Sequence, residues 1–287
     1  MTTMPVKRDK TIIIHSKVSY GYVGSSTTAL VLQTGRQDVI TVPTVLYSNR
    51  LGLASVGGDV LPTALFASIL DGILQLDILA EVTSIITGFI GSAEQVGITA
   101  GFVEKVKAQH PEIIYLCDPV MGDADEFYVA PGVPGAMINR LIPLADVLTP
   151  NFFELQQMLG GHFSSLEEMA AAIRENGRFS EQELVVTSCR FADTPPGWLD
   201  IVSLDNGQLH LERTPRVAVD PPGTGELFAA HMHLQMLHGV AFPTAIRRAA
   251  RVMQAVLTGI KTDNRREMAL QDILHSMEIA GREAAGR

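Results

Sequence analysis

Residues 11–34 have the sequence TIIIHSKVSYGYVGSSTTALVLQT, in which a short apolar run, a loop with two glycines and a longer amphipathic segment follow one another. The three isoleucines favour a buried β-strand, because β-branched side chains pack well on a pleated sheet. The glycines of the loop allow close backbone approach, and Ser25 is a residue type that caps helices. This stretch therefore predicts a strand over 11–15, a loop and a helix over 25–34.

The same alternation continues along the rest of the chain and predicts βαβ units around a parallel sheet. Further strands are expected at 38–43, 82–87, 113–117, 146–149 and 184–187, and further helices at 61–75, 93–109, 154–159, 166–175, 225–238 and 244–260. Between 198 and 219 two short strands flank Asn206-Gly207, a dipeptide that tolerates the positive φ of a tight hairpin turn. We therefore expect a three-layer α/β/α fold with a central, mostly parallel sheet and an antiparallel hairpin at its edge.

Composition limits the class of protein. The chain has 287 residues, 46% of them hydrophobic, with no Ser/Gly-rich linker, internal repeat or low-complexity tract, so we expect a single domain over 1–287. Acidic residues outnumber basic ones by 31 to 22 without a clustered basic face, which disfavours a nucleic-acid partner. The apolar runs are too short for a signal peptide or for the about 18 residues of a membrane span. With Cys117 and Cys189 as reduced thiols, we expect a cytoplasmic protein that binds a small molecule.

Small and polar residues collect directly after the predicted strands. Ligands of open α/β sheets bind beyond the carboxyl ends of the strands. Asp118 follows the strand at 113–117, while Asn151 and Glu154 follow the strand at 146–149 and lie one helical turn apart. Amide and carboxylate oxygens of this kind suit a hydrated Mg²⁺. Capping of a helix or strand end, without metal, is the alternative interpretation of all three residues.

The strongest single feature is the segment 220–226, DPPGTGE, which runs directly into an apolar-periodic segment. Gly223, Thr224 and Gly225 would leave backbone N–H groups unpaired at a helix N-terminus, and the helix dipole adds positive potential, so together they predict an anion hole. Glu226 would stand at its rim, where a phosphoryl group and its acceptor meet. The Walker loop and the dinucleotide fingerprint are both absent from the sequence.

Three histidines of the predicted helix at 225–238 resemble a metal cluster, but we interpret them as structural. His231 and His233 are two residues apart, and side chains at that spacing point to different faces of a helix. The third, His238, lies at the predicted end of the helix. Cys117 is interpreted in the same way, as a packed small side chain within an apolar strand.

Seven segments in order resemble the pyridoxal kinases of the ribokinase-like superfamily, over nearly the whole chain. They are the Ser16 loop with GYVG at 21–24, VPTVLYSN at 42–49, TGF at 87–89, DPVMGD at 118–123, TPN at 149–151 with Glu154, VTS at 186–188 and GTG at 223–225. Any one of them is weak, but seven in order are specific. The resemblance implies a homodimer and ATP-dependent phosphorylation of the 5′-hydroxyl of pyridoxal to pyridoxal 5′-phosphate in vitamin B6 salvage, with pyridoxine and pyridoxamine as further substrates.

The resemblance also implies a role for each matching residue. Ser16 would hydrogen-bond the polar edge of the pyridine ring, and apolar walls and ring contacts would come from Val45, Tyr47, Phe89 and Tyr128. Magnesium and its water would be organised near the ATP phosphates by Asp118, Asn151 and Glu154. ATP phosphate would be bound by Asp118, Thr187, Ser188 and the anion hole, with K⁺ or Na⁺ as a further ligand of Thr187 and Ser188. The hairpin near Asn206 and the helix at 244–260 would flank adenine and ribose. For Tyr47 and Phe89, a place in the core is the alternative.

Three positions depart from the family pattern. Glu226 stands where the family usually carries the Asp that accepts the proton of the substrate hydroxyl, and Arg50 stands where many members have His. Phe127 and Tyr128 occupy a stretch where some members have a Cys, so covalent capture of the aldehyde is not expected. Glutamate adds a methylene, and a displacement of roughly one ångström can lower the rate about 10²-fold unless backbone or rotamer compensates. We therefore hypothesise a kinase whose activity is reduced by Glu226.

Two alternative functions remain open from the sequence. One is a related kinase of hydroxymethylpyrimidine, although the GYVG loop and the Ser-Asn segment at 48–49 favour pyridoxal. The other is a non-catalytic protein that binds pyridoxal phosphate or a nucleotide, an alternative that Glu226 alone motivates.

Overall fold

The computed structural model describes residues 8–124, 126–179 and 181–284, and its centre is one large sheet. The strands of this sheet are β1 (Lys10–Val18), β2 (Asp38–Tyr47), β3 (Gly58–Val60), β4 (Val82–Thr87), β5 (Ile114–Cys117), β8 (Val147–Leu148), β9 (Glu183–Cys189), β10 (Trp198–Asp205) and β11 (Gln208–Pro215). Their order across the sheet is β11-β10-β9-β8-β5-β4-β1-β2-β3. All pairs from β9 to β2 are parallel, whereas β10, β11 and β3 run antiparallel to their neighbours.

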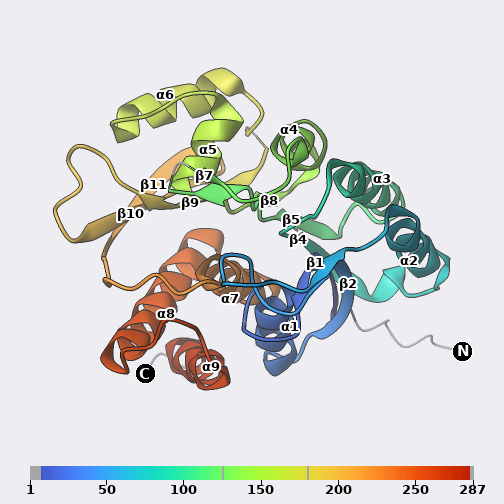
Figure 1. Ribbon diagram of the computed structural model, residues 1–287. Helices are drawn as coiled ribbons and strands as arrows, with labels where there is room; N and C mark the ends of the chain where they lie inside the picture. Colours follow the sequence, from blue (N-terminus) through green and yellow to red (C-terminus); the bar gives the residue numbers. More distant parts are fainter. Residues whose placement is uncertain (1–7, 125, 180, 285–287) are drawn as a thin grey trace, which may run out of the picture.

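Helices cover both faces of the sheet, which makes three layers (Figure 1). One face carries α2 (Thr63–Gln75), α3 (Ala93–Gln109), α4 (Val133–Ala136), α5 (Phe152–Leu159) and α6 (Leu166–Asn176), and the other carries α1 (Ser25–Thr34), α7 (Thr224–Leu237), α8 (Phe242–Thr262) and α9 (Leu270–Ala284). Alternate residues of β1 serve the two cores: Ile12 and Ile14 pack with the α2–α6 layer, whereas Ile13 packs with α7 and α8. The predicted α/β/α fold with its edge hairpin is confirmed.

The structure adds elements that the sequence pattern did not predict. A three-residue strand, β3, pairs antiparallel with β2, so both edges of the sheet are antiparallel. Two-residue strands β6 (Gly122–Asp123) and β7 (Glu126–Phe127) form a small separate hairpin. The C-terminal helix α9 buries Ile273 on the α7–α8 side. The three strands are too short to show a hydrophobic period, whereas α9 has an amphipathic pattern, with Leu270, Ile273, Leu274 and Met277 at helical spacing, that the sequence prediction missed. Residues 1–7, the first part of the N-terminal stretch whose apolar run is too short for a signal peptide, lie outside the described residues.

The histidines of α7 are structural, as predicted. The Nε2 atom of His231 lies 2.7 Å from the Ser276 hydroxyl of α9, whereas Nε2 of His233 lies 2.8 Å from the Ser84 hydroxyl of β4. Both imidazoles are buried, and they face opposite sides of α7. They fix α7 between the sheet and α9. Within the described part of the chain, every helix is too short or too polar to cross a bilayer.

The pH dependence of stability tests the structural role of His233. Burial lowers the pKa of His231 and of His233 to about 4, from an ordinary value of 6.5. Below that ordinary value the unfolded chain takes up protons that the folded chain does not, so folded stability is present above it and falls as the pH drops toward 4. At a pH of about 5, the loss amounts to about 2 kcal/mol for each histidine.

The variant His233→Gln places an amide nitrogen near the position of Nε2 and does not titrate. We expect its free energy of unfolding in urea to fall by about 2 kcal/mol less than that of the wild type when the pH is lowered to about 5. Equal pH slopes in the two proteins would show that His233 does not stabilise the fold as a neutral group.

Candidate active site

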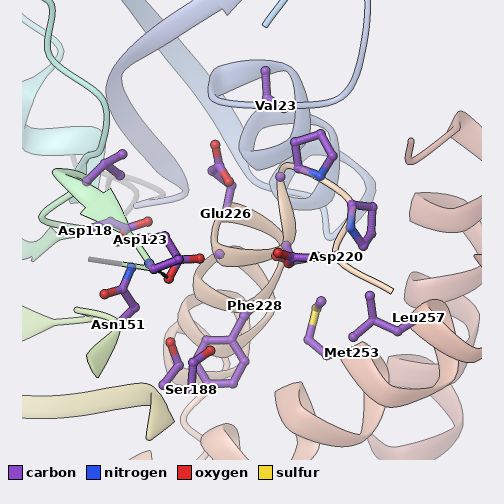
Figure 2. A pocket seen from close by; sticks show the side chains of 18 of the residues that line it. Val23, Asp118, Asp123, Asn151, Ser188, Asp220, Glu226, Phe228, Met253 and Leu257 are labelled. Carbon is purple, nitrogen blue, oxygen red and sulfur yellow. Dashed lines mark hydrogen bonds between the residues drawn. The ribbon is translucent and has the colours of Figure 1, made fainter. Parts of the chain in front are cut away.

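A cavity of about 1280 Å³ lies at the carboxyl ends of the parallel strands, between the start of α7, the hairpin and α8 (Figure 2). It brings together nearly all of the site residues expected from the sequence: Ser16, Tyr47, Phe89, Asp118, Tyr128, Asn151, Glu154, Thr187, Ser188, Gly223, Thr224, Gly225 and Glu226. Val45 is the exception, because its side chain is fully buried in β2 and does not line the cavity. Tyr47 and Phe89 are only partly buried, so they are cavity residues rather than core aromatics.

The N-terminus of α7 is open to the cavity. The first intrahelical hydrogen bond runs from the Leu227 N–H to the Gly223 carbonyl, at 3.1 Å, and Gly223 offers no side-chain cap. The N–H groups of the three preceding residues, Thr224, Gly225 and Glu226, are thus available to an anion. Gly223 has φ +90°, and a Cβ atom there would overlap the carbonyl oxygen of Tyr22, so only glycine fits.

The carboxylate of Glu226 is held by a residue of the first βα loop. Its Oε1 accepts a hydrogen bond of 2.9 Å from the backbone N–H of Gly24, 202 positions away in sequence. Gly24 has φ +58°, and a Cβ atom at this position would overlap Ser16 Oγ and lie 2.6 Å from the Ser16 carbonyl oxygen. One glycine therefore touches both the candidate base and the candidate ring contact. In Figure 2, Glu226 points toward the loop that carries Val23.

Two further carboxyl groups, those of Asp118 and Glu154, line the same cavity as Glu226 and are buried. Burial and the charge of Glu226 raise the pKa of Asp118 well above its ordinary value. Burial and the charge of Asp118 raise the pKa of Glu154 well above its usual range. Glu154 is held by the N–H of Met121 on Oε1, at 2.9 Å, and by the N–H of Asn151 on Oε2, at 2.8 Å. The charged forms of both groups would gain from a nearby cation.

Asn151 forms a capping box with Glu154. Its Oδ1 accepts from the Glu154 N–H and its Nδ2 donates to the Gly122 carbonyl, both at 2.8 Å. Capping is thus shown, and it leaves room for a metal role, since each carboxylate offers about four lone-pair sites. Within residues 8–124, 126–179 and 181–284, no three His, Cys, Asp or Glu side chains gather closely enough to hold a metal directly. The oxygens present fit a Mg²⁺ ion that keeps most of its water.

Thr187 and Ser188 lie at the end of β9. Thr187 forms an isolated parallel bridge with Asn151, and its N–H donates to the Pro150 carbonyl at 3.0 Å. Ser188 has φ +60°, a left-handed conformation that is uncommon for residues other than glycine and occurs often at functional sites. The pairing of β9 with β10 is irregular at this point, as expected for a β-bulge.

One part of the cavity wall is apolar. Phe228, Met253 and Leu257 line it from α7 and α8 (Figure 2). Met253 and Leu257 are one helical turn apart, a spacing that could have identified this wall in the sequence. The hairpin also lines the cavity, through the end away from its turn, with Leu199 and Thr214.

Arg50, in the loop after β2, also lines the cavity. Its Nε and Nη2 atoms donate to Glu267 Oε1 at 2.9 and 2.6 Å, which joins the loop after β2 to the segment between α8 and α9. That segment is fixed by the paired hydrogen bonds of Arg265 with Asp272, at 2.6 and 2.7 Å. Glu267 is 217 positions from Arg50, so no local signal reveals this pair.

Comparisons with known proteins agree with this geometry. A family model described as phosphomethylpyrimidine kinase matches residues 39–268. The pyridoxine/pyridoxal/pyridoxamine kinase of Bordetella avium is 33% identical over 247 residues, which cover 86% of this chain and 83% of the relative. The pyridoxal kinase PdxY of Deinococcus radiodurans is 34% identical, covering 85% of this chain and 84% of the relative.

Solved structures agree as well. The pyridoxal kinase from Leishmania donovani in complex with ADP and pyridoxamine superposes with a TM-score of 0.83 at 26% identity, covering 96% of this chain and 95% of that chain. The pyridoxal kinase from Entamoeba histolytica gives a TM-score of 0.81 at 25% identity, covering 88% and 90%. The chain is therefore a phosphotransferase of the ribokinase-like α/β/α fold, and it belongs to the pyridoxal kinase family.

Proposed function

We propose that this kinase transfers the terminal phosphoryl group of ATP to the 5′-hydroxyl of pyridoxal, forming pyridoxal 5′-phosphate in vitamin B6 salvage, and that it also accepts pyridoxine and pyridoxamine. One observation carries the proposal: the open N-terminus of α7 and the carboxylate of Glu226 meet in one cavity with two buried acids, Asp118 and Glu154. The names of the relatives support the choice of vitamer, and hydroxymethylpyrimidine finds less support.

In the proposed mechanism, the protein positions two groups and stabilises charge, as phosphoryl transfer requires. The N–H groups of Thr224, Gly225 and Glu226 bind the oxygens of the transferred phosphoryl group, where negative charge develops. The Glu226 carboxylate orients the attacking 5′-hydroxyl and accepts its proton through Oε2, while Gly24 holds Oε1. Asp118, Asn151 and Glu154 would hold Mg²⁺ through its water, and the ion would neutralise charge on the ATP phosphates.

The contact between Gly24 and Glu226 bears on the reach of the base. Glutamate is one methylene longer than the Asp usual in the family, and a backbone N–H at 2.9 Å now fixes where its carboxylate ends. We propose that this hydrogen bond compensates for the added length. With this compensation, we no longer expect the reduced activity that the sequence suggested, because the loop that carries Gly24 places the Glu226 carboxylate.

The remaining wall residues fit the two substrates. Ser16 would contact the polar edge of the pyridine ring, and Tyr47, Phe89 and Tyr128 would supply its walls. Thr187 and Ser188 would contact phosphate together with K⁺ or Na⁺, and the apolar end at Met253 and Leu257 would take adenine. A single domain over 1–287, a homodimer and a cytoplasmic location complete the proposal.

A coupled ADP-release assay tests the proposed reaction. With ATP and Mg²⁺, we expect turnover of pyridoxal, pyridoxine and pyridoxamine and little with hydroxymethylpyrimidine. The variant Glu226→Gln keeps the side-chain length but removes the base, and we expect its kcat to fall by about 10²-fold or more. Saturable pyridoxal binding without ADP release, or a higher kcat/KM for hydroxymethylpyrimidine, would contradict the proposal.

Asp118→Asn tests the proposed metal residues. The amide keeps the shape of the side chain and loses its charge, so we expect the Mg²⁺ concentration for half-maximal activity to rise roughly tenfold. At saturating Mg²⁺, the KM for pyridoxal should stay within about threefold of the wild type, because Asp118 is not proposed to contact the ring. In Glu226→Gln the pattern should reverse, with a lower kcat and an unchanged Mg²⁺ requirement. An unchanged requirement in Asp118→Asn would remove Asp118 from the metal site.

A further inference from the structure

His15 is a buried titratable residue that the proposed mechanism does not use. It ends the apolar run of β1, immediately before Ser16, and it is 1% exposed. Its Nδ1 accepts a hydrogen bond of 2.8 Å from the backbone N–H of Ser16 and lies 3.2 Å from Ser16 Oγ. The imidazole therefore contacts the backbone N–H and the hydroxyl of a residue that lines the cavity.

These contacts determine the protonation of the ring. Because the Ser16 N–H donates to Nδ1, that nitrogen carries a lone pair and the proton lies on Nε2. Nε2 is buried without a hydrogen-bond partner among the described residues, and it lies so close to Gly88 that a Cβ atom there would overlap it. Burial lowers the pKa of His15, and the charge of Glu226 opposes that shift without reversing it. The imidazole is neutral, and its Nδ1 is only an acceptor.

The neutral ring in turn fixes the direction of the Ser16 hydroxyl. With Nδ1 restricted to accepting, the Ser16 hydroxyl is the donor of the contact at 3.2 Å, where it shares the single Nδ1 lone pair with the Ser16 N–H at 2.8 Å. Gly24 packs so closely on Ser16 Oγ that a Cβ atom at position 24 would overlap it. The hydroxyl hydrogen thus points toward His15, and Ser16 Oγ presents lone pairs to the cavity.

We propose that His15 is a positioning residue that holds the Ser16 hydroxyl as a hydrogen-bond acceptor, so that the site binds a substrate ring through its protonated nitrogen. An unprotonated ring nitrogen would place two acceptors against each other, whereas a pyridinium N–H donates to Ser16 Oγ. The inference rests on the proposed function, in which Ser16 contacts the polar edge of the pyridine ring.

Two variants test whether the hydrogen-bond acceptor of the His15 side chain, and not only its shape, is needed. In His15→Asn, Oδ1 takes the place of Nδ1 and keeps an acceptor there, whereas His15→Leu puts a methyl group at that position. Each protein is measured with pyridoxal and with a carbocyclic analogue in which ring nitrogen is replaced by C–H. Dissociation constants are obtained by direct titration, separately from kcat and from the KM for ATP. The two substitutions, one in the protein and one in the ligand, form a double-mutant cycle.

We expect the wild type and His15→Asn to bind pyridoxal roughly tenfold more tightly than the analogue, and His15→Leu to discriminate less than about threefold, with the KM for ATP unchanged. An undiminished preference in His15→Leu would overturn the inference. So would equal losses in both variants accompanied by lower melting temperatures, which would indicate a purely structural role. Pyridoxal turnover by a wild type that does not discriminate would overturn this inference alone, whereas absence of both pyridoxal binding and turnover would overturn the proposed function with it.

Discussion

The hydrogen bond between the Gly24 N–H and the Glu226 carboxylate joins the two loops on which the site depends. One loop follows β1, the third strand from the β3 edge of the sheet, and the other leads into α7. A second close contact joins the same loops, because Gly223 lies against the carbonyl of Tyr22. Both contacts require a residue without Cβ and with positive φ, so two glycines set the distance between the phosphate-binding helix and the ring-binding loop.

The same junction concentrates negative charge in a buried place. Asp118 and Glu154 line the same cavity as Glu226. Burial raises the pKa of both groups, and so do the charge of Glu226 for Asp118 and the charge of Asp118 for Glu154. Backbone N–H groups offset part of this cost: Glu154 accepts from Met121 and Asn151, and Glu226 accepts from Gly24. The remaining charge favours a cation and is set beside an anion-binding helix end. Acidic side chains that favour a cation, next to a helix N-terminus that binds an anion, suit a reaction that brings metal and phosphate together.

Local patterns predicted the fold well, whereas long-range pairs escaped them. The β1 to α1 unit, from Lys10 to Thr34, and the GTGE helix start are each encoded by neighbouring residues, a range over which periodicity and glycine placement are informative. The structural reading of His231 and His233 followed from helix geometry alone and is confirmed. In contrast, Glu226 meets Gly24 across 202 positions and Arg50 meets Glu267 across 217. Such pairs, like the burial of Val45, follow from strand order and register, which a single sequence does not specify.

The kcat of Glu226→Asp tests most directly whether the longer base is matched to Gly24. Aspartate restores the residue usual in the family, but it withdraws the carboxylate from the Gly24 N–H by about one ångström. The account predicts that kcat for pyridoxal falls by about 10²-fold, with little change in the KM for ATP. A kcat equal to or above that of the wild type would contradict it, and would mean that glutamate holds the base out of position.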